Sequence, residues 1–87
     1  MSRITAEERK RFHNYLDEAI DKLNSPKNIK KEHWSNLSTH TLFDLFKNEN
    51  YELDDAIDFE SNENIIDECY DNINFPLFII DNLRRNK

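Results

Sequence analysis

The stretch LFDLFKNENYELDDAI, residues 42–57, decides the fold of this chain. Its apolar residues recur at spacings of three and four positions, which is the period of one face of an α-helix. They are Leu42, Leu45, Phe46, Leu53, Ala56 and Ile57. Ser38 precedes the run and is a residue type that caps helix N-termini. We therefore expect a helix over about 39–57.

The sequence before this stretch predicts another amphipathic helix. Thr5 and Glu8 have the spacing of a capping box, and an apolar stripe of helical period follows them. Pro26 stops the stripe, because the residue before a proline avoids the helical conformation. We expect this helix over about 6–24. Residues 25–37 then form a linker with the only locally basic stretch before the C-terminus.

A third helix is expected over about 62–85, with Ser61 or Asn62 as its N-cap. Pro76 lies inside this segment and is expected to kink or loosen it. The chain contains no glycine, which excludes glycine-rich phosphate loops and most tight hairpins. The predicted fold class is therefore all-α, with a three-helix subunit.

Composition limits the classes of protein that fit. The 87 residues make one small domain, in which 37% of residues are hydrophobic and 34% are charged. The net charge of −6 repels a nucleic-acid backbone, and no apolar run is long enough to span a membrane. Cys69 is the single cysteine, so internal disulfides are excluded. We expect a cytoplasmic protein that covers its thin core as a homodimer or a dimer of dimers.

Four carboxylates fall where apolar side chains are expected. Glu49 lies in the middle of the apolar stripe of the 39–57 helix, with Glu52 at its edge, and Glu68 lies in the apolar arc of the third helix, with Asp71 beside it. A carboxylate in such a place costs several kcal/mol unless it is paired, coordinated or neutralised. Two antiparallel helices would bring the four together. Oxygen ligands alone select hard cations, Mg²⁺ or Mn²⁺.

The acidic segments ENYE, residues 49–52, and ECYD, residues 68–71, are separated by 15 residues. At this spacing they resemble the ExxE and ExxD motifs of the MazG-like all-α nucleoside triphosphate pyrophosphohydrolases. The flanking segments KKEHW, residues 30–34, and DNINF, residues 71–75, are similar to those of small phage and bacterial members. The resemblance covers about 27–85.

The resemblance implies a function and a set of site residues. The metal-binding and catalytic residues would be Glu49, Glu52, Glu68 and Asp71. Asn74, the amide after the second motif, would contact the nucleotide. The implied reaction is hydrolysis of an NTP or dNTP to the monophosphate and pyrophosphate with Mg²⁺. Asn48 stands where family members often carry a glutamate, and Pro76 stands where they carry a small apolar residue.

Several of these residues have more than one interpretation. Trp34 is either a stacking surface for a nucleobase or a lid on the core. Lys30 and Lys31 either bind phosphate or are simply solvated. The four acids are either a working metal site, an inactive one, or surface charges paired with Lys and Arg. The alternative function is therefore a catalytically inactive nucleotide-binding protein, or an acidic protein-interaction module, on the same helical scaffold.

Overall fold

The structure is a computed structural model that describes residues 2–85, and it confirms the all-α class. No strand is present in this part of the chain. The elements are α1 (Ala6–Asp21), the 3₁₀ turn η1 (Lys22–Asn24), α2 (Pro26–Ile29), the 3₁₀ turn η2 (Trp34–Asn36), α3 (Thr39–Phe59) and α4 (Asn62–Arg85). The long helices lie within about two residues of the predicted ranges, if η1 is counted as the end of the first.

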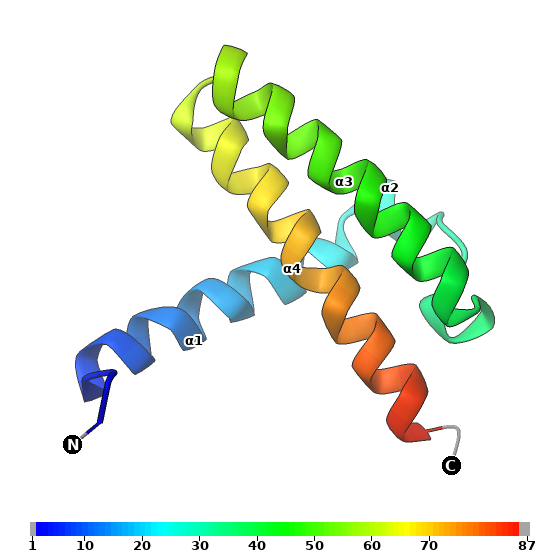
Figure 1. Ribbon diagram of the computed structural model, residues 1–87, viewed down its shortest axis with the longest axis horizontal. Helices are drawn as coiled ribbons and strands as arrows, with labels where there is room; N and C mark the ends of the chain where they lie inside the picture. The colour runs from blue at the N-terminus through cyan, green and yellow to red at the C-terminus, as the bar shows by residue number, and fades with distance from the viewer. Residues whose placement is uncertain (1, 86–87) are drawn as a thin grey trace.

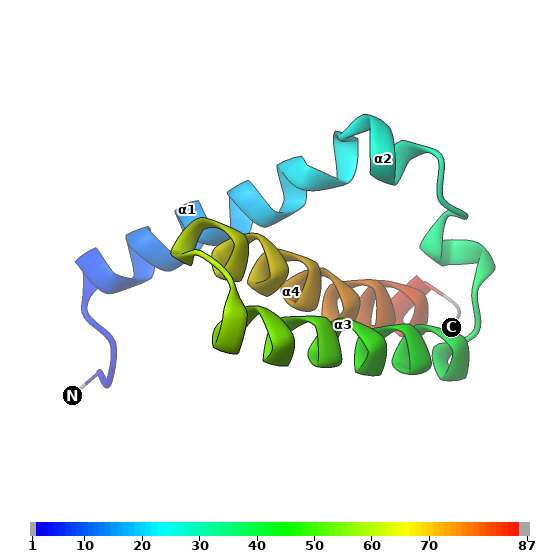
Figure 2. The same cartoon turned by 90° about the horizontal axis from the view of Figure 1, so that it is seen from above.

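Helix α4 is the centre of the molecule. It runs antiparallel to α3 after a tight connection, and these two helices form the main contact of the fold. Helix α1 crosses α4 on the side away from α3, so α4 lies between them (Figures 1 and 2). No helix within residues 2–85 combines the length and the apolar character needed to cross a membrane.

The predicted helix caps are present. Thr5 Oγ1 accepts a hydrogen bond from the Glu8 N–H at 3.0 Å, and Glu8 Oε1 accepts one from the Thr5 N–H at 2.8 Å, which completes the capping box. The hydroxyls of Ser38 and Ser61 each accept a hydrogen bond from the backbone N–H three residues ahead. Of the two candidates for the third cap, the structure therefore uses Ser61 rather than Asn62.

The linker over residues 25–37 is more ordered than the sequence predicted, so the described chain has four α-helices and not three. Pro26 both ends the first helix and begins α2, because a proline at the first helical position loses no hydrogen bond. Asn82 of α4, which is 5% exposed, holds the second half of the linker. Its Nδ2 donates to the carbonyl oxygens of Trp34 and Leu37, at 2.9 and 3.1 Å.

The hydrophobic core is thin. Only three apolar residues of the described chain are fully buried, Ala19, Leu42 and Ala56. The radius of gyration is 14.5 Å, whereas a compact domain of this length has a value of about 12 Å. A single copy thus leaves much apolar surface uncovered.

Helix α4 continues through Pro76 without ending there.

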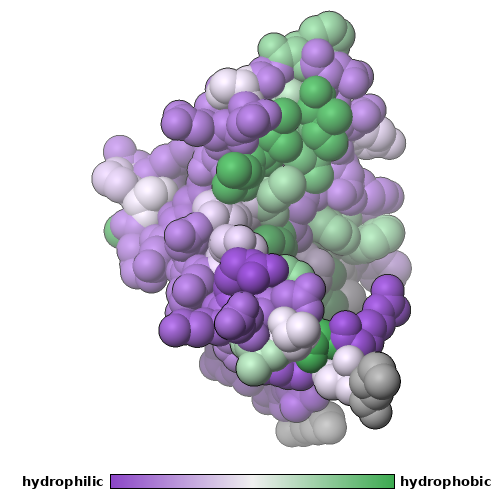
Figure 3. All heavy atoms as spheres, turned by 90° about the vertical axis from the view of Figure 1, so that its left-hand side faces the viewer, coloured by the Kyte–Doolittle hydropathy of each residue, from purple (hydrophilic) through white to green (hydrophobic). Residues whose placement is uncertain are grey.

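Two residues of the apolar stripe predicted for the 39–57 helix are in fact exposed: Leu45 by 37% and Ile57 by 58%. Other large apolar side chains with high exposure include Phe12, Tyr51, Phe59, Ile66 and Leu83. Figure 3 shows hydrophobic side chains gathered on one face, near the end of the molecule where α3 turns into α4. The stripes are therefore wider than a single α3–α4 contact can bury.

Candidate metal centre

Three of the four predicted carboxylates meet at the α3–α4 contact. Glu49 comes from α3, and Glu68 and Asp71 come from α4, where their spacing of three places them on one face. Each residue offers an oxygen that lies within 4.8 Å of those of the other two. All three side chains are partly buried. The structure therefore brings together one acid of the first motif and both acids of the second.

Glu52 does not join this group. It lies about one helical turn after Glu49 and is exposed. Its negative charge nevertheless acts on Glu49, because, after burial, it is the main cause that raises the pKa of Glu49. Glu52 is thus a neighbour of the cluster and not one of the three clustered carboxylates.

The electrostatics of the cluster oppose ionisation. Burial, followed by the charges of Glu52, Asp71 and Glu68, raises the pKa of Glu49 from 4.5 to about 7. Burial, followed by the charges of Asp71 and Glu52, also raises the pKa of Glu68. Without a cation, therefore, the folded protein holds a proton on Glu49 at a pH where an ordinary glutamate would have lost it.

Two carboxylate oxygens in the cluster lack a partner within residues 2–85. These are Glu49 Oε2 and Glu68 Oε2, and both are buried. A buried polar atom without a hydrogen bond costs free energy, and so such atoms mark places where a ligand is expected. The donor set contains oxygen only, which favours Mg²⁺ or Mn²⁺ over zinc.

Asn72 fixes the two helices in register at the centre. Its Nδ2 donates to the carbonyl oxygen of Glu49 at 3.1 Å and to that of Glu68 at 2.8 Å. One amide therefore connects the backbones that carry two of the clustered acids. Asn72 has no sequence signal of its own except its position directly after Asp71, which places it near the same face.

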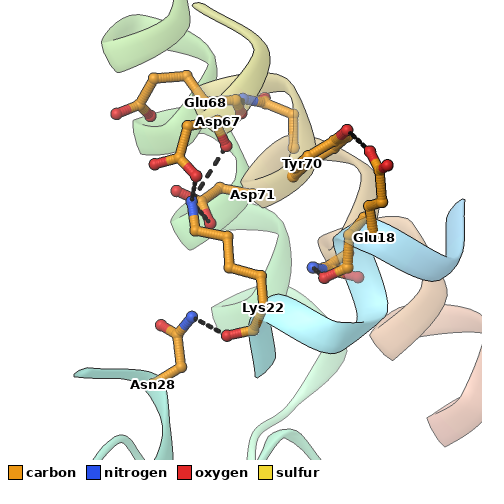
Figure 4. Close-up of polar contacts among 10 residues, drawn as sticks. Glu18, Lys22, Asn28, Asp67, Glu68, Tyr70 and Asp71 are labelled. Atoms are coloured by element: carbon orange, nitrogen blue, oxygen red, sulfur yellow. Dashed lines mark hydrogen bonds and ion pairs between the residues drawn. The ribbon is translucent and has the colours of Figure 1, made fainter. Parts of the chain in front are cut away.

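Lys22 supplies a positive charge beside the cluster, and no motif in the sequence predicts this contact. Its Nζ lies 2.8 Å from Asp71 Oδ1 and 2.9 Å from Asp67 Oδ1, and it donates to the carbonyl oxygen of Asp67 at 3.1 Å. Figure 4 shows the side chain reaching from the end of α1 to these groups on α4. Burial disfavours the charged form of Lys22, but the two aspartates outweigh this effect and raise its pKa.

A cavity of about 810 Å³ adjoins the carboxylates. Glu49 and Asp71 form part of its wall, and the aromatic side chains of Trp34, Phe75 and Phe78 form another part. Its volume lies within the range of small-molecule sites. Of the two predicted phosphate contacts, Lys31 lines the cavity, whereas Lys30 is exposed and does not.

Both faces of Trp34 are covered by side chains. Its ring stacks on Phe78, with centroids 4.6 Å apart, and on His33, with centroids 3.8 Å apart. Its Nε1 donates to Asp81 Oδ2 at 2.9 Å. A nucleobase would therefore have to replace the exposed His33 in order to stack on Trp34.

Asn74 is buried between α1 and α4, with 2% of its surface exposed. Its Nδ2 donates to the carbonyl oxygen of Ala19 at 2.8 Å, and its Oδ1 has no partner in the described part of the chain. The residue lines the cavity. Its amide nitrogen is thus used to hold α1 against α4, and the predicted contact with a nucleotide stays a prediction.

No family model matches this chain, and no curated protein or solved structure matches it at a significant level. The candidate centre is therefore characterised by its geometry and by the two acidic motifs. The clustered carboxylates and the adjoining cavity are the features on which a function can be based.

Proposed function

We propose that this chain is a Mg²⁺-dependent pyrophosphohydrolase of nucleoside triphosphates, of the MazG-like type that its two acidic motifs resemble. The observation that carries the proposal is the convergence of Glu49, Glu68 and Asp71, with ligand oxygens within 4.8 Å of one another. The buried, unpartnered oxygens of the two glutamates support it further. Mn²⁺ is a second ion that would suit the same ligands.

The roles of the acids follow from their positions. Glu49, Glu68 and Asp71 would hold the ion. A bound Mg²⁺ would neutralise phosphate charge and polarise the phosphorus under attack. Glu52 lies beside Glu49 without joining the three ligands, and so it is the carboxylate left free to accept the proton of the attacking water.

The cavity would hold the rest of the substrate. The triphosphate would lie toward Glu49 and Asp71, and Lys31 would offer a positive charge from the cavity wall. The base and sugar would lie toward the aromatic side chains of Phe75 and Phe78. No covalent enzyme intermediate is required, because water is the nucleophile in this reaction.

A screen of NTPs and dNTPs with Mg²⁺ tests the proposed reaction. We expect at least one nucleotide to give pyrophosphate and the monophosphate, and no release when Mg²⁺ is omitted. Pyrophosphate and inorganic phosphate must be measured separately, because release of phosphate alone would indicate a different bond cleavage. Nucleotide binding without turnover across the whole panel would favour the inactive nucleotide-binding alternative, and tight binding of a basic protein instead would favour the acidic interaction module.

We also propose that the chain assembles as a homodimer or a dimer of dimers. The thin core and the exposed apolar residues on α3 and α4 support this proposal, because monomers rarely expose large apolar patches. Light scattering at micromolar concentration is expected to give at least twice the monomer mass. Ile57→Asp is expected to reduce that mass, whereas Asp54→Asn, a change at an exposed polar position of α3, is not. A wild-type monomer with a melting temperature independent of concentration would contradict the proposal.

A further inference from the structure

The ion pairs of Lys22 differ from the others in the described chain. Within residues 2–85 they are the only ion pairs that join two helices. Lys47 and Asp44, by contrast, pair at 3.2 Å along the exposed face of α3, where their side chains are 51% and 70% exposed. Such surface pairs contribute little to stability. The Lys22 pair therefore needs its own explanation.

The ammonium group of Lys22 is held in a fixed position. The side chain is 17% exposed, and its three donors have three acceptors: Asp71 Oδ1, Asp67 Oδ1 and the Asp67 carbonyl oxygen. Asp71 itself is 22% exposed. One end of this arrangement, Asp71, belongs to the carboxylate cluster and also lines the cavity. Lys22 thus places a positive charge next to the cluster at a defined point (Figure 4).

We propose that Lys22 is a built-in counter-ion of the metal centre, which stabilises the metal-free protein and lowers the affinity of the centre for a divalent cation. This inference rests on the proposed function. A lysine ammonium and a divalent ion that contact the same carboxylate repel each other. Lys22 and the ion therefore compete for Asp71. When Mg²⁺ binds, Lys22 gives up its contact with Asp71 and stays with Asp67. Lys22 is a positioning residue in this scheme, since it acts through Asp71.

This role predicts that removing the charge of Lys22 lowers the melting temperature of the metal-free protein and raises its affinity for a divalent ion. Lys22→Met keeps the length of the aliphatic stem and removes the charge. The metal-free variant is expected to melt at a lower temperature, because the clustered acids lose a compensating charge. Its affinity for Mn²⁺ is expected to rise about tenfold, since the repulsion of the incoming ion is removed. A residue with only a structural role would lower the melting temperature without raising the affinity.

The experiment measures Mn²⁺ binding by titration calorimetry or electron paramagnetic resonance, together with melting curves with and without Mg²⁺. Four proteins are compared: the wild type, Lys22→Met, Lys22→Arg and Lys47→Met. Lys22→Arg keeps the charge and is expected to bind Mn²⁺ with nearly the wild-type affinity. Lys47→Met makes the same change of charge at the exposed pair with Asp44 and is expected to leave both readouts unchanged.

The outcomes separate this inference from the proposed function. If the wild type binds Mn²⁺ and Lys22→Met binds it no more tightly, the counter-ion role is overturned and the metal centre stands. If neither protein binds a divalent ion, both are overturned. Should Lys22→Met fail to fold, the ammonium signal of Lys22 in the wild type can be followed by nitrogen-detected NMR. A shift or loss of that signal at saturating Mg²⁺ supports the proposal, and an unchanged signal overturns it.

Discussion

Replacing Glu49 with glutamine is expected to abolish pyrophosphate release and to make the metal-free protein more stable. The substitution keeps the shape of the side chain and removes its charge. The pKa of Glu49 is raised from 4.5 to about 7, so the folded state resists its ionisation. At pH 8 the gain in unfolding free energy is about 1–2 kcal/mol, once the full value for such a shift is reduced for the part of the side chain that solvent screens. A gain in stability combined with a loss of function is typical of a residue kept for activity.

Chemical denaturation with and without Mg²⁺, beside the pyrophosphate assay, measures both effects. Asp54→Asn is the matched control, because Asp54 is an exposed acid on the same helix and lies outside the cluster. It is expected to change neither stability nor activity by a measurable amount. If Glu49→Gln keeps its activity, or if it is less stable than the wild type without metal, Glu49 is a structural residue and the catalytic assignment fails.

Raising the pH from about 5 to 8 is expected to destabilise the metal-free protein, and Mg²⁺ is expected to reverse this loss. The folded-state pKa of Glu49 lies above its ordinary value of 4.5, so the folded protein binds this proton more tightly than the unfolded chain does. The resulting stability is fully present below pH 4.5 and is lost as the pH rises through about 7. The raised pKa of Glu68 acts in the same direction.

Other shifted carboxyls do not disturb this window. A backbone hydrogen bond from Thr5 lowers the pKa of Glu8, and the indole of Trp34 lowers that of Asp81, so both groups stay ionised between pH 5 and 8.

Mg²⁺ at a hundredfold excess over its dissociation constant adds about 2.7 kcal/mol to the unfolding free energy. Because protons compete with the ion for Glu49, the stabilisation by Mg²⁺ grows as the pH rises.

Melting curves at several pH values, with Mg²⁺ and with monovalent salt of equal ionic strength, test this dependence. The monovalent salt is expected to have a smaller effect than Mg²⁺. The Glu49→Gln variant is expected to show a flatter pH dependence than the wild type. Two results would contradict the proposed centre: a wild-type melting temperature that rises with pH in the absence of metal, or one that Mg²⁺ does not change at pH 8.

The helices could be predicted from the sequence because their signals are local. The capping box of Thr5 and Glu8 and the caps at Ser38 and Ser61 are formed by residues three positions apart. A helical period also suffices to place a charged residue among apolar ones, and this is how Glu49 was recognised. The short connection between the two helices predicted an antiparallel pair, which brings Glu49 close to the acids of α4.

The remaining features depend on how distant segments cross, and a helical period does not encode that. Lys22 looks like an ordinary cation near the end of a helix until α1 is placed across α4. Asn82 looks like a polar surface residue until the linker folds back onto it. Ile57 was predicted to lie in a buried stripe, but it is exposed. The helical period shows which face of a helix is apolar, but it does not show how much of that face a neighbouring helix covers.

The division of the centre between two parts of the chain has a consequence for how such a protein diverges. The three clustered acids and Asn72, which fixes their register, all belong to the α3–α4 hairpin, whereas the counter-charge comes from the end of α1. Under the proposed counter-ion role, substitutions of Lys22, in η1 directly after α1, would change the metal affinity of the centre without altering any of the three acids. Homologous chains adapted to different magnesium concentrations are expected to differ first at the position of Lys22, while their hairpins stay alike.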